Sequence, residues 1–177
     1  MPSKTEELAS KGMGIAKGVK ARVEGLHGVF RHLAEEHGEV TVLLMRLKGS
    51  SDIEKRRDLF PKIRAELLGH EKAELRHVYP AFEENAELAP LAKRHDDEAS
   101  ELEQTLEELH AMAFDDAQWQ TKFDRLVELV SEHVDEEEDE FFPAGDRVLG
   151  KARAEAILER YEETKKAITA EAERGAR

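Results

Sequence analysis

Cysteine is absent from this 177-residue chain, which also has only five prolines and 6% aromatic residues. Without cysteine, the chain cannot form disulfide bonds, thiolate metal sites, iron–sulfur clusters or thiol nucleophiles. No apolar run reaches the length of a membrane span, and the first 25 residues lack the apolar segment of a signal peptide. We therefore expect a cytoplasmic protein that does not bind a membrane.

Basic residues are also fewer than acidic residues. The chain has 27 Lys and Arg residues against 40 Asp and Glu residues, so its formal net charge is −13. Nucleic acids and anionic membranes bind basic surfaces, so neither is expected as a partner. Long tracts of Ala, Glu, Leu, Lys and Arg are abundant instead, which is typical of helical proteins. The length suits one domain with a sizeable core.

Four long stretches carry apolar residues at three- and four-residue spacing, separated by short segments rich in Gly, Pro, Ser or Asp. They predict helices near residues 26–48, 53–79, 88–112 and 116–142. Asp52 is the expected N-cap of the second helix, Pro61 either starts or bends it, and the fourth helix is expected to end at Pro143. Because short connections favour antiparallel neighbours, the sequence predicts an all-α, up-down-up-down four-helix bundle.

The bundle is expected to span residues 26–145 and to have a flank on each side. Residues 1–25 contain four glycines, which are poor helix formers, and predict a short N-terminal arm. Residues 146–177 predict an extra C-terminal helix with Ile157, Tyr161 and Ile168 on one side. This helix either packs on the bundle or forms the contact of a homo-oligomer.

A motif that occurs twice carries most of the functional information. It consists of a histidine, a glutamate four residues later and an aromatic–proline pair nine and ten residues later: His70, Glu74 and Tyr79-Pro80, then His133, Glu137 and Phe142-Pro143. A lone histidine precedes each copy, His37 before the first and His95 before the second. This doubled arrangement predicts a metal centre held between two pairs of helices.

The histidines and glutamates of the motif fall on the apolar stripes of the predicted helices, so they should point into the core. A spacing of four residues brings an imidazole and a carboxylate to the same side of a helix. A buried carboxylate without a partner costs several kcal/mol, and bound cations remove that cost. We therefore predict six metal ligands: His37, His70, Glu74, His95, His133 and Glu137. Such ligands suit iron, zinc, copper or nickel, and paired carboxylates favour iron or manganese.

Other titratable residues receive simpler interpretations. The pair His32 and Glu36 has the same spacing but lies among charged residues, so we expect it on the surface. Glu71 and Glu98 could each approach the metals, but a position facing solvent is expected for both. His77 could lie beside the ligands, but a solvated or structural role is expected. Tyr79 either packs at the end of the bundle or donates a hydrogen bond into the site.

A rival pattern is that of ferritin-like di-iron bundles, which use Glu-x-x-His on two helices. It occurs at three places: Glu24 and His27, Glu74 and His77, and Glu107 and His110. Only Glu74 lies on a core stripe away from a helix end, so this pattern is the weaker of the two.

The doubled motif resembles that of the hemerythrin-like, or HHE cation-binding, domain family over about residues 26–145. The family has a lone histidine on its first and third helices and His-x-x-x-Glu on its second and fourth. The resemblance implies a left-handed bundle around two non-haem iron ions with an oxo or hydroxo bridge. It also implies that the four histidines are terminal ligands and that Glu74 and Glu137 bridge the metals.

One departure from the family pattern bears on function. Oxygen-carrying hemerythrins have a fifth histidine where this chain has Ala99, so the chain is more similar to the four-histidine branch. A missing imidazole leaves open metal positions, which favour redox chemistry. The resemblance therefore implies a protein of oxidative or nitrosative stress that reacts with dioxygen, peroxide or nitric oxide. The alternatives are a non-enzymatic dioxygen or iron binding, sensing or storage protein, and a bundle with a structural metal such as zinc or with none. No catalytic residue is assigned.

Overall fold

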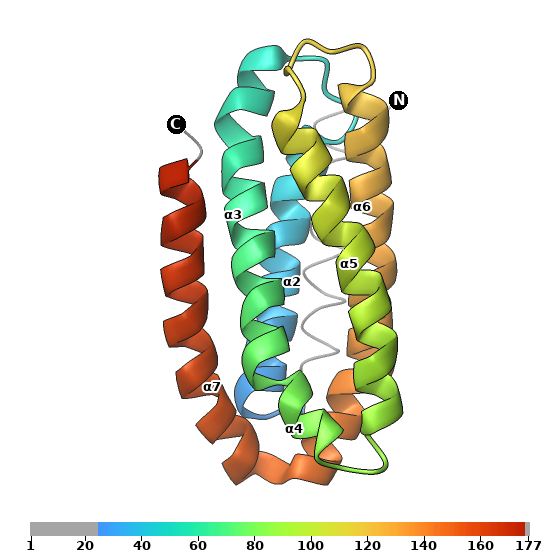
Figure 1. Cartoon of the computed structure of the whole chain (residues 1–177), viewed down its shortest axis with the longest axis vertical. Helices are drawn as coiled ribbons and strands as arrows, with labels where there is room; N and C mark the ends of the chain where they lie inside the picture. The colour runs from blue at the N-terminus through green and yellow to red at the C-terminus, as the bar shows by residue number, and fades with distance from the viewer. Residues whose placement is uncertain (1–24, 176–177) are drawn as a thin grey trace, which may run out of the picture.

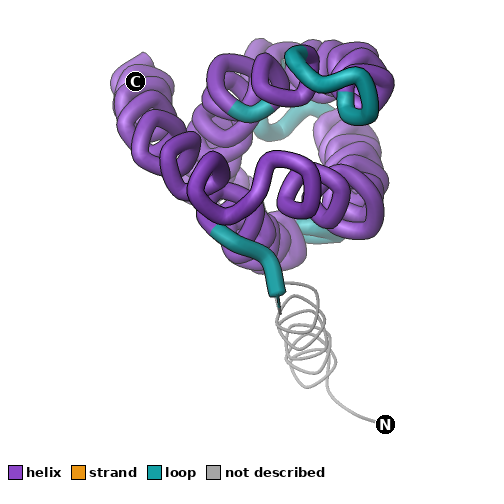
Figure 2. The backbone as a smooth tube through the Cα atoms, turned by 90° about the horizontal axis from the view of Figure 1, so that it is seen from below, coloured by secondary structure: helices purple, strands orange, loops and turns teal. Residues whose placement is uncertain are grey.

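The computed structural model describes residues 25–175, apart from the side chains of residues 96–98. Four long helices run antiparallel to their sequence neighbours: α2 (Gly28–Leu47), α3 (Ile53–His77), α5 (Ala89–Ala111) and α6 (Trp119–Glu136). Seen along their length, they surround a common core (Figure 2). The predicted all-α bundle is confirmed. The predicted N-terminal arm falls outside the described residues except for Gly25.

The start of α3 follows the expected capping rule. The side chain of Asp52 accepts hydrogen bonds from the backbone N–H groups of Glu54 and Lys55, at 3.1 and 3.3 Å. Pro61 lies inside α3 without interrupting it. Pro80 stands in the first turn of the short helix α4 (Tyr79–Glu83), where its missing N–H costs little.

The fourth helix does not end at Pro143, as the sequence predicted. It continues from α6 through a π-helical turn, η1 (Glu137–Phe141), into α7 (Phe142–Gly175). Pro143 is the second residue of α7, directly after the π-helical turn, and the helix continues past it. The chain changes direction instead at Gly150, whose φ of 72° is a conformation that glycine adopts readily.

Beyond Gly150, α7 turns back along the outer side of α3 and α2 (Figure 1). This is the predicted extra C-terminal helix, and it packs on the bundle through the buried side chains of Ala154, Ile157 and Tyr161. On α3, a Cβ atom at Gly69 would lie 2.2 Å from the hydroxyl oxygen of Thr169, so the glycine permits this close approach. A homo-oligomer through α7 stays a prediction.

Buried apolar residues form two clusters towards opposite ends of the bundle. One contains Phe30, Phe82 and Phe142, and the other contains Phe60, Trp119 and Phe123. Between them, a layer of buried histidine and glutamate side chains crosses all four long helices. None of the helices in the described range has the length and apolar character needed to cross a bilayer.

Candidate metal centre

All six predicted ligands lie in the buried polar layer. Their exposed fractions range from 0 to 8%: His37 3%, His70 8%, Glu74 0%, His95 0%, His133 6% and Glu137 0%. The apolar stripes explain this placement, since each side chain takes the position of an apolar residue on the stripe that faces the core. The structure therefore brings together the residues that the doubled motif singled out.

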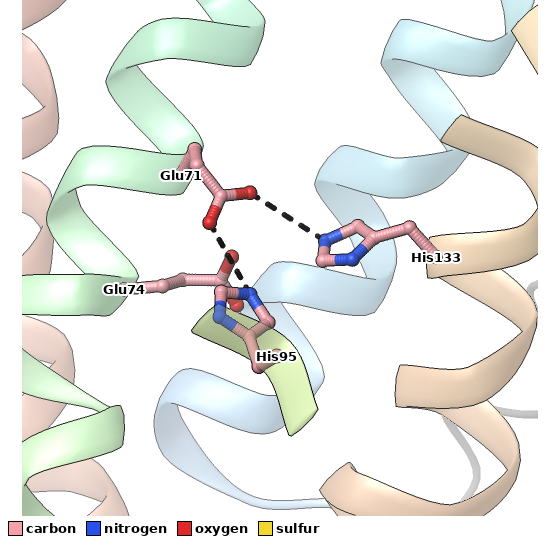
Figure 3. Close-up of side chains that lie close together, drawn as sticks. All are labelled: Glu71, Glu74, His95 and His133. Atoms are coloured by element: carbon pink, nitrogen blue, oxygen red, sulfur yellow. Dashed lines mark ion pairs between the residues drawn. The ribbon is translucent and has the colours of Figure 1, made fainter. Parts of the chain in front are cut away.

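The donor atoms of these six residues and of Glu71 form two adjacent groups. One contains His37, His70 and Glu137, and the other contains Glu71, Glu74, His95 and His133 (Figure 3). Within each group, one donor atom per residue lies within 4.8 Å of the others. This spacing is short enough for each group to surround a single cation.

Two carboxylates lie between the groups. Glu74 Oε2 is 3.1 Å from Nε2 of His70, although Glu74 belongs to the other group. Glu137 Oε2 is 3.2 Å from Nε2 of His37 and 3.4 Å from Nε2 of His133. Each carboxylate is therefore placed to be shared by two neighbouring cations.

The hydrogen-bonding of these carboxylates fits metal binding. Neither oxygen of Glu74 accepts a hydrogen bond from the described residues, and the same holds for Oε1 of Glu71 and Oε2 of Glu137. Buried oxygens without donors are costly, and a cation is the partner that imidazole and carboxylate groups jointly suit. The residues present thus fit a pair of transition-metal ions.

Glu71 does not face solvent as predicted. It is 4% exposed, and its oxygens lie 3.3 Å from Nε2 of His95 and 3.6 Å from Nε2 of His133 (Figure 3). Burial raises the pKa of Glu71 to about 8; the charge of His133 opposes the shift, while those of Glu74 and Glu137 add to it. The prediction was wrong because α3 is enclosed on several sides, so residues beside its apolar stripe are buried too. The side chain of Glu98 lies outside the described residues.

Glu138 is a further carboxylate that sequence reasoning missed. It is 5% exposed, and its Oε1 lies 3.0 Å from Nδ1 of His37. A regular helix would turn residues 137 and 138 about 100° apart. Residues 137–141 form a π-helical turn, which contains one residue more than a turn of regular α-helix. Such turns are frequent at functional sites. The 3.6-residue period of a regular helix gives no indication that Glu138 is buried.

Glu36 also lies closer to the site than expected. Its Oε2 is 2.9 Å from Nδ1 of His70, and its Oε1 is 3.0 Å from Nε2 of His32. Burial alone would raise the pKa of Glu36, but hydrogen bonds with His32 and His70 outweigh it and hold the pKa below its usual range. The predicted surface pair His32–Glu36 is partly buried because α7 covers this side of α2, a contact that the sequence alone does not specify.

The aromatic residues of the doubled motif pack on the lone histidines. Tyr79 stacks on His95 with ring centroids 3.7 Å apart, and Phe142 stacks on His37 at 5.5 Å. The Tyr79 hydroxyl also donates a hydrogen bond to Glu137. Each copy of the motif thus fixes the lone histidine that belongs to the other copy.

The rival Glu-x-x-His pattern is not assembled among its described members. Nε2 of His77 lies 2.7 Å from the hydroxyl of Thr164 on α7, outside the core. His110 is exposed, and His27 caps α2 beside Asp146. Glu24 lies outside the described residues.

A cavity of about 160 Å³ reaches the metal centre between α2, α3 and α6. Much of its exposed wall is apolar, from Val40, Leu43, Leu67, Leu102, Val130 and Val134. The charged residues Glu36, Glu66 and Lys165 also line it. It also contacts His37, His70, Glu71 and His133, and the exposed Glu39 is among its outer residues. A small uncharged molecule could occupy it beside the donor groups.

Comparisons with known proteins found a family that matches most of the chain and a distant curated relative. The family described as the hemerythrin HHE cation binding domain matches residues 20–144. A curated protein named DNA nickase, from Nostoc sp. (strain PCC 7120 / SAG 25.82 / UTEX 2576), is 26% identical over 136 residues. The match covers 75% of this chain and 38% of that relative. No solved structure matches the chain.

Proposed function

The chain belongs to the hemerythrin HHE cation-binding family, and on that premise we propose that it is a non-haem di-iron protein. The observation that carries the proposal is the pair of adjacent, buried donor groups with two carboxylates between them. Four imidazoles with shared carboxylates favour iron or manganese over zinc. The resident ions would be joined by an oxo or hydroxo bridge as well as by the protein.

We assign the ligands by their grouping. His37 and His70 would hold one iron, His95 and His133 the other, and Glu74 and Glu137 would bridge them. Glu71 would be an additional ligand of the second iron, since its oxygens face His95 and His133. The His37/His70 position then has one protein ligand fewer and would be the one that accepts a small molecule.

The surrounding residues support this assignment by orienting the histidines. Glu138 lies at Nδ1 of His37, and Glu36 lies at Nδ1 of His70, so Nε2 of each ring faces the other donor atoms. Tyr79 fixes His95 by stacking and Glu137 by a hydrogen bond. Partners of this kind set ring orientation and raise metal affinity.

When bound, a pair of irons supplies or accepts electrons in reactions with small oxidants. We propose dioxygen, peroxide or nitric oxide as the partner, because the apolar cavity beside His37 and His70 suits small uncharged molecules. On this basis we propose a role in oxidative or nitrosative stress, in the cytoplasm as the sequence predicts. Binding, sensing or storage without turnover is the alternative. Peroxide consumption by the iron protein supports turnover, whereas a reversible dioxygen spectrum without consumption supports binding.

Metal content and the optical spectrum of the purified protein test the proposal. We expect two irons per chain, one for each donor group, and a near-ultraviolet band from the bridge. A double variant, His70→Ala with His133→Ala, should lose both the iron and the band. His110→Ala is the matched control because this histidine is exposed at the end of α5. Full iron retention in the double variant would remove both histidines from the ligand set.

A further inference from the structure

The part of α7 that follows Gly150 lies beyond the family match, which ends at residue 144, yet it reaches the metal centre. Its Tyr161 is fully buried. The Tyr161 hydroxyl donates a hydrogen bond to Oε2 of Glu36 at 2.6 Å and lies 3.1 Å from Nδ1 of His70. Glu36 Oε2 is itself 2.9 Å from that nitrogen. Hydroxyl, carboxylate and imidazole thus form a closed triangle on the outer side of His70.

The position of this triangle matters because it engages the nitrogen that faces away from the donor group. Nε2 of His70 points inward, 3.2 Å from Nε2 of His37 and 3.1 Å from Glu74. A histidine ligand is oriented by the partner on its other nitrogen, here Glu36. Fixing Glu36 therefore fixes the direction of Nε2.

Two residues of α7 hold Glu36 in place. Tyr161 binds its Oε2, and Nζ of Lys165 lies 2.6 Å from its Oε1. Lys165 also pairs with Glu66 of α3 at 3.0 Å, so the same lysine links α7 to both α2 and α3. Without α7, His32 would be the remaining described partner of Glu36 besides His70.

The support from α7 is unequal between the two donor groups. His95, in the second group, stacks on Tyr79, the first residue of α4, and the Tyr79 hydroxyl donates a hydrogen bond to Glu137. The hydrogen-bond and ring partners given for Tyr161 are His32, Glu36 and His70, on the side of the first group. Loss of the Tyr161 hydroxyl should therefore affect one metal position more than the other.

We propose that Tyr161 is a positioning residue for His70 and that docked α7 retains the metal at the His37/His70 position. The inference rests on the proposed di-metal centre. In this proposal the C-terminal helix positions His70, which the four-helix bundle does not do by itself. Because α7 packs along both α3 and α2, its docking would then be coupled to metal retention at this position.

Metal release from three variants tests this role. Tyr161→Phe removes only the hydroxyl, and Glu36→Gln weakens the same triangle from the other side. Thr164→Val is the matched control, since it removes the contact between α7 and His77 but leaves Glu36 untouched. Each protein is loaded with Co²⁺, and transfer of the metal to an excess of chelator is followed by absorbance. Circular dichroism and thermal unfolding check that each variant is folded.

We expect biphasic release from all proteins. In Tyr161→Phe and Glu36→Gln, the phase that reports the His37/His70 position should be about 10–100-fold faster than in the wild type. Loss of the hydrogen-bond partner of a histidine ligand weakens metal binding by a factor of this size. The second phase should be unchanged. Thr164→Val should release both metals as the wild type does. Glu71→Gln identifies the second phase, because it weakens the His95/His133 position alone.

Three results would overturn the inference: unchanged release from Tyr161→Phe, equal acceleration of both phases, or the same acceleration in Thr164→Val. These results differ from a failure of the proposed function. If the wild type binds fewer than two Co²⁺ per chain, the di-metal centre is wrong and the inference fails with it. If the wild type binds two but the Tyr161 variant matches it, only the role of α7 is wrong.

Discussion

At the scale of single residues, the buried carboxylates dominate the energetics of the site. Glu71, Glu74, Glu137 and Glu138 are all 5% exposed or less. A buried charge that lacks a full set of partners costs several kcal/mol, even after the surroundings relax. Bound cations offset this cost, so metal binding and folding should be coupled.

Glu71→Gln should separate the cost of burying this carboxylate from its contribution to metal binding. Burial raises the pKa of Glu71 to about 8 in the folded protein, so its contribution to stability is present at low pH and is lost as the pH rises through that value. In metal-free protein at pH 9, the variant should unfold at a higher temperature than the wild type, by roughly 5 °C for a gain of about 2 kcal/mol. Near pH 5 the difference should nearly vanish.

Thermal unfolding in chelator, followed by circular dichroism, measures this effect. Glu39→Gln serves as the control because Glu39 is exposed. With metal present, the order should reverse, since the variant loses a ligand. An unchanged unfolding temperature at pH 9 would mean that Glu71 carries no cost in the metal-free protein.

Tyr79→Phe isolates the hydroxyl that bonds to Glu137 while it keeps the stacked ring on His95. Losing a partner of Glu137, which we propose as a bridging ligand, should weaken metal binding about 10-fold. Tyr79→Leu removes both contacts and should weaken it further. Competition with a chelator measures both values, and equal affinities for the wild type and the two variants would exclude Tyr79 from the support of the site.

At the scale of helices, two local departures from regular geometry shape the molecule. The π-helical turn η1 brings Glu137 and Glu138 into the core together. Gly150 then redirects α7 back along the bundle. The doubled motif and the helix periodicity predicted the bundle and the burial of its six residues. They could not predict Glu36, Glu71 or Glu138, because these depend on the π-helical turn and on how the helices, including α7, enclose one another.

Gly150→Ala tests the turn into α7. The glycine has φ 72°, and a Cβ atom there would meet nothing within 4 Å, so the cost is that of the backbone alone. We expect the free energy of unfolding to fall by about 1–2 kcal/mol. Gly175→Ala, in open space at the end of α7 without a positive φ, is the control. Chemical denaturation measures both, and an equal effect of the two substitutions would contradict the expected backbone cost at Gly150.

At the scale of the whole molecule, the polar layer divides the core into two apolar clusters. The layer joins α2, α3, α5 and α6, so a metal pair within it would connect all four long helices. The connection reaches α7 as well, through Tyr161 and Glu36. Metal should therefore stabilise the bundle as a unit rather than one helix pair.

Removal of metal should accordingly lower the unfolding temperature of the entire chain. Free metal at 100 times its dissociation constant adds about 2.7 kcal/mol to stability, which is a shift of roughly 5–10 °C for a protein of this size. Calorimetry with and without chelator measures the shift. The double variant His70→Ala with His133→Ala should show none.

The central claim is that two metal ions lie side by side between the four helices, and anomalous diffraction at the iron edge tests it most directly. Crystals of the iron-loaded protein should give two strong peaks per chain. One should lie among His37, His70 and Glu137, and the other among Glu71, Glu74, His95 and His133. A single peak, or peaks away from these side chains, would contradict the account.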